Sequence, residues 1–298
     1  MQIHLHQTQW REFPNGISAD GQVFAIPDIH GRARVLAAAL DHVAGLPAPP
    51  QMSRHLVFNG DITDRGKENF AAIDLVLSAQ IRNGRRIVTF GNHDGMLLDG
   101  LDLPLSSGAF RFWHDNGGYA MLDELACGGT GSPQELRRKL HARLPRTWLE
   151  RLRAKLDGDF RSHFVSGDLL FVHAGIPGYG REGNRNAADL DRFLAQPLPG
   201  ATQLASPKHH WAWIRPGSPD WTGRWDRDGR RVIVHGHTCE YEGPITSDDE
   251  IFGAIDKIRT ERRISLDLFG IRGGRLAVFE AIMGRYRLHV FEDRLLRA

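Results

Sequence analysis

The sequence predicts an α/β protein with two β-sheets, and three observations support this fold class. Short apolar runs alternate with helix-like segments at 32–45 and 67–84, which gives a β-α-β-α-β order. Each of these runs ends in a polar cluster, as parallel strands do at a ligand-binding edge. Near the C-terminus, strand-like runs at 262–269, 274–281 and 285–292 are separated by glycine-containing turns, which favours an antiparallel meander and a mixed second sheet.

Five apolar runs rich in Val, Ile and Phe are expected to be buried strands. They are residues 22–27, 55–58, 86–90, 168–172 and 231–234. The helix-like segment 67–84 has one apolar face, which carries Phe70, Ile73, Leu77 and Ile81. Because parallel strands joined by helices direct their C-terminal loops to one edge of the sheet, we expect the polar clusters after these runs to converge in space.

We expect a single domain over residues 1–298 with a helical insertion at about 96–165. That stretch has helical patterns interrupted by CGGTGSP and few strand signals. The stretches 176–210 and 239–262 are rich in Gly, Pro and charge and lie next to polar clusters, which is typical of substrate loops.

The composition excludes several classes of protein. The 298 residues are 41% hydrophobic and 25% charged, so the chain can bury a normal core. Its 38 Lys and Arg against 36 Asp and Glu leave a net charge of +2, so no general attraction to nucleic acid or membranes is expected. No apolar run approaches the roughly 18 residues of a membrane-spanning helix. Only Cys127 and Cys239 are present and the N-terminus does not resemble a signal peptide, which favours a reducing cytoplasm.

The polar clusters contain residue types that bind metal ions. An isolated Asp-x-His such as Asp28 and His30 is more often a solvated turn, but four further clusters supply matching side chains. Carboxylate and amide oxygens combined with imidazoles suit Mn, Fe or Zn better than Ca. Six such side chains exceed what one open site uses, so we expect two divalent cations bridged by Asp61. The predicted ligands are Asp28, His30, Asp61, Asn92, His173 and His237.

The segment NGDITDRG (59–66) concentrates charge in one turn. If Asp61 bridges two metal ions, Asp64 remains to orient and polarise His93, the candidate proton donor in the next cluster. Arg65 then offers a planar fork for two phosphate oxygens. A helix cap at Asp64 with a solvated Arg65 is the simpler alternative, but it leaves Asp61 and the other clusters unexplained.

The motifs IPDIHGR, GDITDRG, GNHD, VHAG and HGHT resemble, in order and approximate spacing, those of calcineurin-like metallophosphoesterases, and look most like the phosphoprotein phosphatase branch. FWHDNGGYAML (112–122), WIR (213–215) and SLDLFGIRGGRLAVFE resemble further elements of bacterial members. The resemblance covers nearly the whole chain and implies a sandwich of two mixed β-sheets flanked by helices. It implies one metal ion held by Asp28, His30 and Asp61, and a second held by Asp61, Asn92, His173 and His237.

Several residues depart from the family pattern. Three substitutions leave the ligands and the proton donor in place, namely Pro27 for Gly, Lys67 for Pro and Asp94 for Glu. Cys239 stands where distant diesterases carry a further metal histidine, which favours the phosphoprotein phosphatase branch. His235 is a weaker ligand candidate, because it and His237 cannot both match the family position.

The expected activity is hydrolysis of a phosphoric ester. Two cations, preferably Mn, would activate a water for direct attack on phosphorus, while His93 protonates the leaving oxygen. Arg65 and Arg215 would bind the phosphate, and neither cysteine has the context of a nucleophile.

The preferred substrate is a protein phosphorylated on serine or threonine. The alternative is a symmetrical bis(5'-nucleosyl)-tetraphosphatase that hydrolyses diadenosine tetraphosphate, a small-molecule phosphate ester. A noncatalytic module that binds phosphorylated ligands is a third interpretation, which the complete ligand set and His93 oppose. No nucleic acid or membrane partner is expected.

Overall fold

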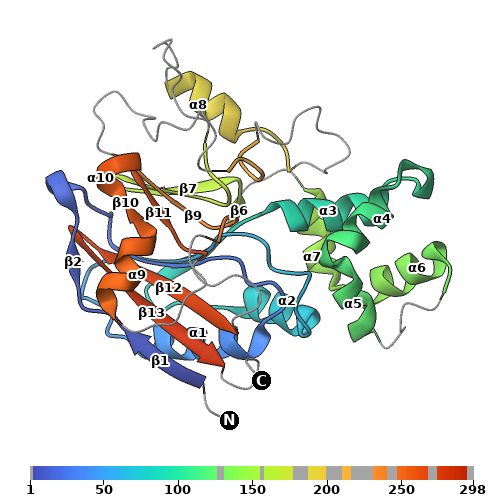
Figure 1. Ribbon diagram of the computed structural model, residues 1–298, viewed down its shortest axis with the longest axis horizontal. Coiled ribbons are helices and arrows are strands. Elements are labelled where there is room, and N and C mark those ends of the chain that lie inside the picture. The colour runs from blue at the N-terminus through green and yellow to red at the C-terminus, as the bar shows by residue number, and fades with distance from the viewer. Residues whose placement is uncertain are drawn as a thin grey trace.

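The computed structural model describes residues 3–125, 131–154, 158–176, 187–198, 210–215, 231–239, 247–267 and 274–293. Two mixed β-sheets pack face to face, with helices on their outer faces (Figure 1). The predicted α/β fold class with two mixed sheets flanked by helices is confirmed. Among the described residues, no helix is both long and apolar enough to cross a bilayer.

The larger sheet has the described order β1-β13-β12-β3-β4-β5-β6, with β2 paired to β13. Strands β3 to β6 are parallel, and the others are antiparallel to their neighbours. Its strands are β1 (Ile3–Gln7), β2 (Arg11–Glu12), β3 (Gln22–Ile26), β4 (Arg54–Phe58), β5 (Gly84–Thr89), β6 (Phe160–Arg161), β12 (Arg275–Ile282) and β13 (Arg285–Asp293).

The smaller sheet has the described order β10-β11-β9-β8-β7. Strands β8, β9 and β11 are parallel, whereas β7 and β10 run antiparallel at its two edges. Its strands are β7 (His163–Ser166), β8 (Leu169–Val172), β9 (Val232–His235), β10 (Asp256–Lys257) and β11 (Arg263–Ser265). All five apolar runs that the sequence singled out therefore form strands.

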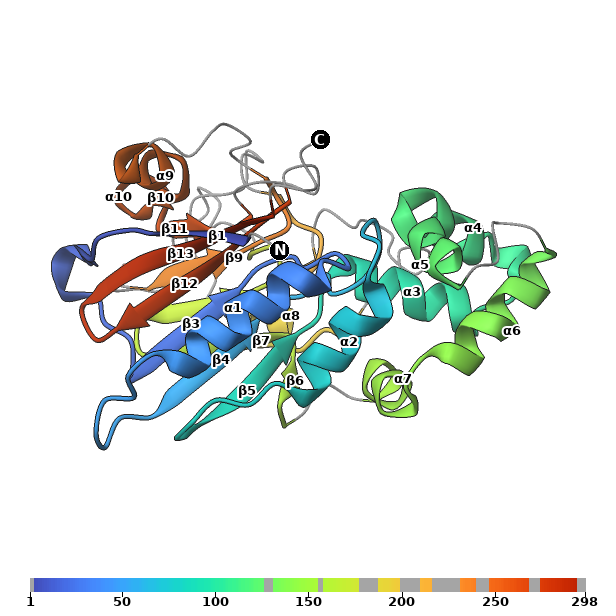
Figure 2. The same cartoon turned by 90° about the horizontal axis from the view of Figure 1, so that it is seen from below.

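The helices lie outside the two sheets. They are α1 (Ala33–Gly45), α2 (Asn69–Ser78), α3 (Asn92–Asp102), α4 (Ala109–Trp113), α5 (Tyr119–Glu124), α6 (Pro133–Arg143), α7 (Arg146–Arg153), α8 (Ala187–Leu194), α9 (Asp248–Ile255) and α10 (Ile258–Glu261). Short 3₁₀ turns lie at Pro14–Gly16 and Leu105–Ser107, and a π-helical turn at His114–Gly118. Figure 2 shows α1 and α2 along the larger sheet and α3 to α7 projecting to one side.

Alternation of side chains along the strands divides the core into layers. Phe24 of β3 faces α1 and α2, whereas its neighbour Val23 faces the interior between the sheets. Phe171 of β8 faces the same interior from the smaller sheet, and Val172 points outward against α8. Both faces of each sheet are therefore covered, as expected for strands that are apolar along their whole length.

The expected C-terminal meander is only partly correct. Strands β12 and β13 form an antiparallel pair, but they join the larger sheet next to β3. Strand β11 lies in the smaller sheet, parallel to β9. All three residues of β11 are buried, and a strand buried on both faces carries no local signal of which neighbour it will choose.

Two further stretches have more regular structure than the sequence indicated. The stretch 96–165 contains helices as far as Arg153, followed by β6 and most of β7. The stretch 239–262 contains α9, β10 and α10. The N-terminal strand β1 was not anticipated, and it pairs with β13 at the opposite end of the chain.

Candidate active site

The strands that carry the polar clusters end together at one edge of the sandwich. Ile26, Phe58 and Val88 are in register at the ends of β3, β4 and β5. Asn59 joins this edge to the smaller sheet, because its Nδ2 donates to the carbonyls of Val172 at 3.1 Å and Val234 at 3.3 Å. The clusters that follow β3, β4 and β5 are thereby brought against those that follow β8 and β9.

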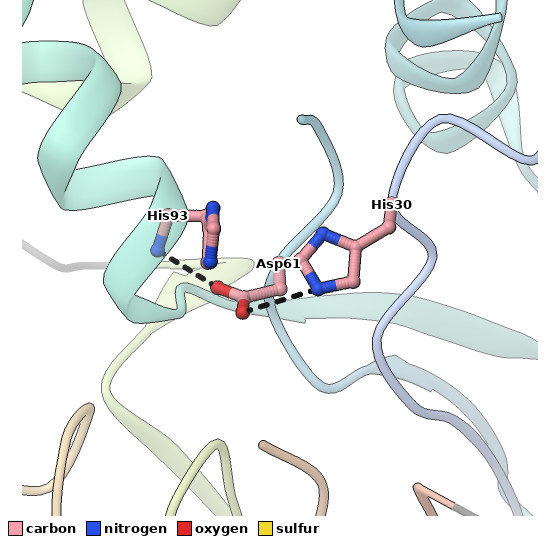
Figure 3. A group of neighbouring side chains, drawn as sticks. All are labelled: His30, Asp61 and His93. Carbon is pink, nitrogen blue, oxygen red and sulfur yellow. Dashed lines mark hydrogen bonds and ion pairs between the residues drawn. The ribbon is translucent and has the colours of Figure 1, made fainter. Parts of the chain in front are cut away.

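Asp61 lies at the centre of the predicted ligands. Its Oδ2 is 3.6 Å from Nε2 of His30 and 3.5 Å from Nε2 of His173. Its Oδ1 accepts a hydrogen bond of 2.9 Å from the backbone N–H of His93 (Figure 3). One carboxylate oxygen therefore lies between two imidazole nitrogens that come from different sheets.

The backbone sets the orientation of both imidazoles. Nδ1 of His30 donates to the carbonyl of Thr63 at 2.9 Å, and Nδ1 of His173 donates to the carbonyl of Asn59 at 2.8 Å. In a neutral ring, each Nε2 then carries a lone pair, and both of these atoms lie close to Asp61. Burial, assisted by nearby His93 and Arg65, lowers the pKa of His30 well below its usual value, which keeps that ring neutral.

The donor set fits divalent cations. Oδ1 of Asn92 lies 3.1 Å from Nε2 of His173, so oxygen and nitrogen lone pairs face one another. Nε2 of His237 is buried and has no hydrogen-bond partner among the described residues. The backbone N–H of His237 donates to Oδ1 of Asp28 at 2.9 Å, which brings the first and last predicted ligands together. A buried group of acceptors with so few donors is the arrangement that bound cations stabilise.

Burial also raises the pKa of the carboxylates, to about 7 for Asp61 and above its usual value for Asp28. Cations bound between these groups would offset the desolvation of the charged forms.

Among the described residues, two groups of three offer metal ligands within 4.8 Å of one another, and Asp61 belongs to both. One contains His173 and His237, as predicted. The other contains His30 and His93, whereas Asp28 lies nearby with its Oδ2 3.9 Å from Nε2 of His30. His93, predicted as a proton donor, therefore lies within reach of the ligand set.

His93 and Asp64 form a buried pair. Nδ1 of His93 lies 2.8 Å from Oδ2 of Asp64, whose Oδ1 accepts a 2.9 Å hydrogen bond from Nε1 of Trp113. Burial raises the pKa of Asp64 to about 8, and burial together with Arg65 lowers the pKa of His93 well below its usual value. Burial therefore disfavours the charged form of each residue of this pair.

Both predicted phosphate-binding arginines lie beside the ligands. Nη1 of Arg65 is 3.1 Å from Nε2 of His30. Nη1 of Arg215 donates to the carbonyl of His237 and to Oγ1 of Thr238, both at 3.3 Å. The segment before Arg215 forms a turn, because two successive backbone N–H groups donate to the carbonyl of His210.

Backbone strain is concentrated at this edge. Ten non-glycine residues in the described ranges have positive φ, and half of them belong to the predicted site. These are His30, Asp61, Asp64, Arg65 and His237. Such conformations cost about 1–3 kcal/mol each and persist where surrounding contacts enforce them, which is typical of functional sites.

The sequence analysis missed three polar residues that support the site. Asn59 links the sheets, and Oδ2 of Asp94 accepts hydrogen bonds from the backbone N–H groups of Asp61 at 3.0 Å and Gly91 at 2.8 Å. Asp267 is a further carboxyl, partly buried, and desolvation and the charge of Asp28 raise its pKa to about 7. A polar residue directly before Gly60 and an aspartate opening DLFGIRGGR were the available signals.

The other histidines in the described part of the chain do not join the two ligand groups. His235 is buried, and its Nε2 lies 3.3 Å from Nη1 of Arg263. His210 supports the turn before Arg215, and His114 is partly exposed beside Asp115.

A sandwich of two mixed sheets with clustered carboxylates, imidazoles and arginines at one edge defines the chain as a metal-dependent phosphoesterase. A family model described as calcineurin-like phosphoesterase matches residues 21–241. The protein therefore belongs to the calcineurin-like phosphoesterase family, whose members depend on two metal ions.

Solved structures of low sequence identity resemble this chain. A metallophosphoesterase from Sphaerobacter thermophilus is 17% identical, with 92% of this chain and 89% of that chain covered and a TM-score of 0.43. A cold-active protein-tyrosine phosphatase of a Shewanella species is 17% identical (88% and 78% covered, TM-score 0.46). A serine/threonine phosphatase from Saccharomyces cerevisiae is 16% identical (92% and 81% covered, TM-score 0.44). No curated protein sequence matches significantly, and these similarities do not indicate a substrate.

Proposed function

We propose that this protein is a serine/threonine protein phosphatase that uses two divalent cations, preferably Mn. The observation that carries the proposal is the position of Asp61, with one oxygen 3.6 Å and 3.5 Å from the Nε2 atoms of His30 and His173. The buried His93 and Asp64 pair lies directly beside it. A bridging carboxylate next to an oriented imidazole suits hydrolysis of a phosphate ester.

The side chains that would hold the two cations are Asp28, His30, Asp61, Asn92, His173 and His237. Oxygen ligands mixed with imidazoles, without thiolates, suit Mn, Fe or Zn better than Ca, and Mn is the ion we propose. When bound, such cations lower the pKa of a coordinated water and offset negative charge on the phosphoryl group.

The other residues act on the substrate itself. Arg65 and Arg215 would each offer a guanidinium to the phosphoryl oxygens. Nη1 of Arg65 lies 3.1 Å from Nε2 of His30, so this guanidinium lies at the site. His93 would donate a proton to the departing oxygen, and Asp64 would orient its ring through Nδ1.

The substrate assignment follows the sequence resemblance of the DRG, GNH and WIR elements to bacterial protein phosphatases. The second candidate, hydrolysis of diadenosine tetraphosphate, is supported by the resemblance of FWHDNGGYAML to such enzymes. Both activities would use the same cations and the same proton donor.

One comparison separates the two candidates. Purified protein with Mn is given either phosphoserine and phosphothreonine peptides or diadenosine tetraphosphate, and kcat/KM is measured for each. We expect release of inorganic phosphate from the peptides to be preferred. Preferred conversion of the dinucleotide to two molecules of ADP would establish the second candidate. Binding of either substrate without turnover would show that the protein is a noncatalytic binding module.

Exhaustive chelation should abolish activity, and added Mn should restore it. The ligands are oxygens and imidazoles, which release divalent ions more readily than thiolates do. Metal content is measured by elemental analysis alongside turnover. Full turnover at near-zero metal content contradicts this prediction.

Replacing Arg65 by lysine should lower kcat/KM and weaken inhibition by inorganic phosphate, with unchanged metal content. Lysine keeps the positive charge but loses the planar fork that binds two oxygens. Arg215→Lys should have a smaller effect, because Arg215 is exposed. The exposed Arg138 of α6 provides a matched control, since Arg138→Lys should change neither quantity. If phosphate inhibits the Arg65 variant as strongly as the wild-type protein, Arg65 does not bind the phosphate and its role is structural.

A further inference from the structure

The segment Trp113–Gly118 forms hydrogen bonds with Asp64 and with Arg65, two neighbouring residues of the proposed active site. Nε1 of Trp113 donates to Oδ1 of Asp64 at 2.9 Å, and the backbone N–H of Arg65 donates to the carbonyl of Gly117 at 2.9 Å. Trp113 and Asp64 are completely buried. The hydrogen bond between them is therefore isolated from competing water, which makes it costly to lose.

Two glycines give this segment its shape. A Cβ on Gly118 would lie 2.2 Å from Cε2 of Trp113, so only glycine leaves room for the indole. Gly117 has φ of +118°, and a Cβ there would lie 2.5 Å from Cγ of Arg65. The chain forms a π-helical turn here, a feature often found at functional sites.

We propose that Trp113 is a positioning residue for proton donation, which holds Asp64 so that Asp64 holds His93. Gly117 has a separate task, because its carbonyl and its missing side chain place Arg65. The segment Trp113–Gly118, which contains no predicted metal ligand, would thus position both the proton donor His93 and the phosphate-binding Arg65. This inference rests on the proposed function, which supplies the roles of His93 and Arg65.

The geometry explains why Asp64 needs a second donor. Oδ2 faces Nδ1 of His93 at 2.8 Å, and Oδ1 is held from the other side by the indole. A carboxylate held at both oxygens cannot rotate about its Cβ–Cγ bond. If the indole N–H is removed, Oδ1 remains buried without this donor, and the carboxylate is free to turn away from His93.

The test compares Trp113→Phe with Trp148→Phe. Both indoles are fully buried, but Nε1 of Trp148 has no hydrogen-bond partner among the described residues. In Trp113→Phe we expect kcat to fall roughly 10-fold for phosphoserine peptides, less than the about 10²–10⁴-fold contribution of a complete general acid. The fall should be much smaller for nitrophenyl phosphate, whose leaving group needs no proton, and KM should change little. Trp148→Phe should leave the ratio of the two activities unchanged.

Two further variants make the assignment specific. Trp113→Phe in a His93→Ala background should cause no additional loss, because residues that act through one another are not additive. Gly118→Ala, which retains the tryptophan but displaces its ring, should reproduce the dependence on leaving group. Gly117→Ala should instead weaken inhibition by inorganic phosphate and leave that dependence unchanged.

A readout independent of turnover distinguishes failure of this inference from failure of the proposed function. The ring Nδ1–H of His93 is observed by NMR, and its resonance should shift or broaden in Trp113→Phe but not in Trp148→Phe. An unchanged resonance, or equal losses on both leaving groups, overturns the inference. Wild-type protein without turnover of any phosphate ester overturns the proposed function alone, because the NMR comparison still tests the positioning of His93.

Discussion

Replacing Asp61 by asparagine should abolish metal binding and activity together. We expect activity to fall by more than about 100-fold, because about 100-fold is the largest typical loss when a residue that only supports a metal ligand is removed. Asparagine has nearly the same size and still offers an oxygen to the backbone N–H of His93. It lacks the negative charge that lies between the Nε2 atoms of His30 and His173. Both predicted metal positions share this carboxylate, so neither should survive its loss.

The measurement combines metal content by elemental analysis with turnover of a phosphopeptide. Asp74→Asn, on the exposed face of α2, is the matched control and should retain both properties. If Asp61→Asn still binds two equivalents of metal and retains turnover, Asp61 does not bridge the cations.

Replacing His93 by glutamine should keep the metals and lower kcat by about 10²–10⁴-fold for substrates with poor leaving groups. Glutamine cannot act as an acid, and it fills most of the space of the buried ring. With nitrophenyl phosphate the loss should shrink, because that leaving group departs without a proton. The exposed His141 of α6 supplies the control, since His141→Gln should be neutral on both substrates.

Metal content decides between two roles for His93, because its ring also lies within ligand distance of His30 and Asp61. Loss of one metal equivalent in His93→Gln would assign this histidine to the ligand set. Equal losses of activity on good and poor leaving groups, with metal retained, would show that it does not donate the proton.

Short-range patterns were sufficient to predict the strands and to indicate that the polar clusters after them lie together. Apolar runs of four to six residues predicted β3, β4, β5, β8 and β9, because burial on both faces selects Val, Ile and Phe whatever the neighbours are. The rule that parallel strands share one C-terminal edge then predicted that the clusters after them converge. In the structure the six predicted ligands, with His93, Asp64, Arg65 and Arg215, lie at that edge.

The same reasoning was wrong about strand partners. Strand β11 was expected beside β12 and β13, but it pairs with β9 in the other sheet. Hydrophobic alternation reports which side of a strand is buried and contains no information about which strand lies next to it. The segment before Arg215, with the buried Trp211, forms a turn, which periodicity alone does not distinguish from a strand.

The sequence by itself determined the fold class, the chemical types of the candidate ligands and the family, because these depend on residue identity and on order along the chain. Only the tertiary structure decided that Asn59 joins the two sheets, that Trp113 holds Asp64 and that Gly117 bonds Arg65. Those contacts connect residues 49 to 175 positions apart, and each depends on an orientation set by the packing of both partners. Local propensity does not determine such orientations, which arise only when the sheets and the insertion pack together.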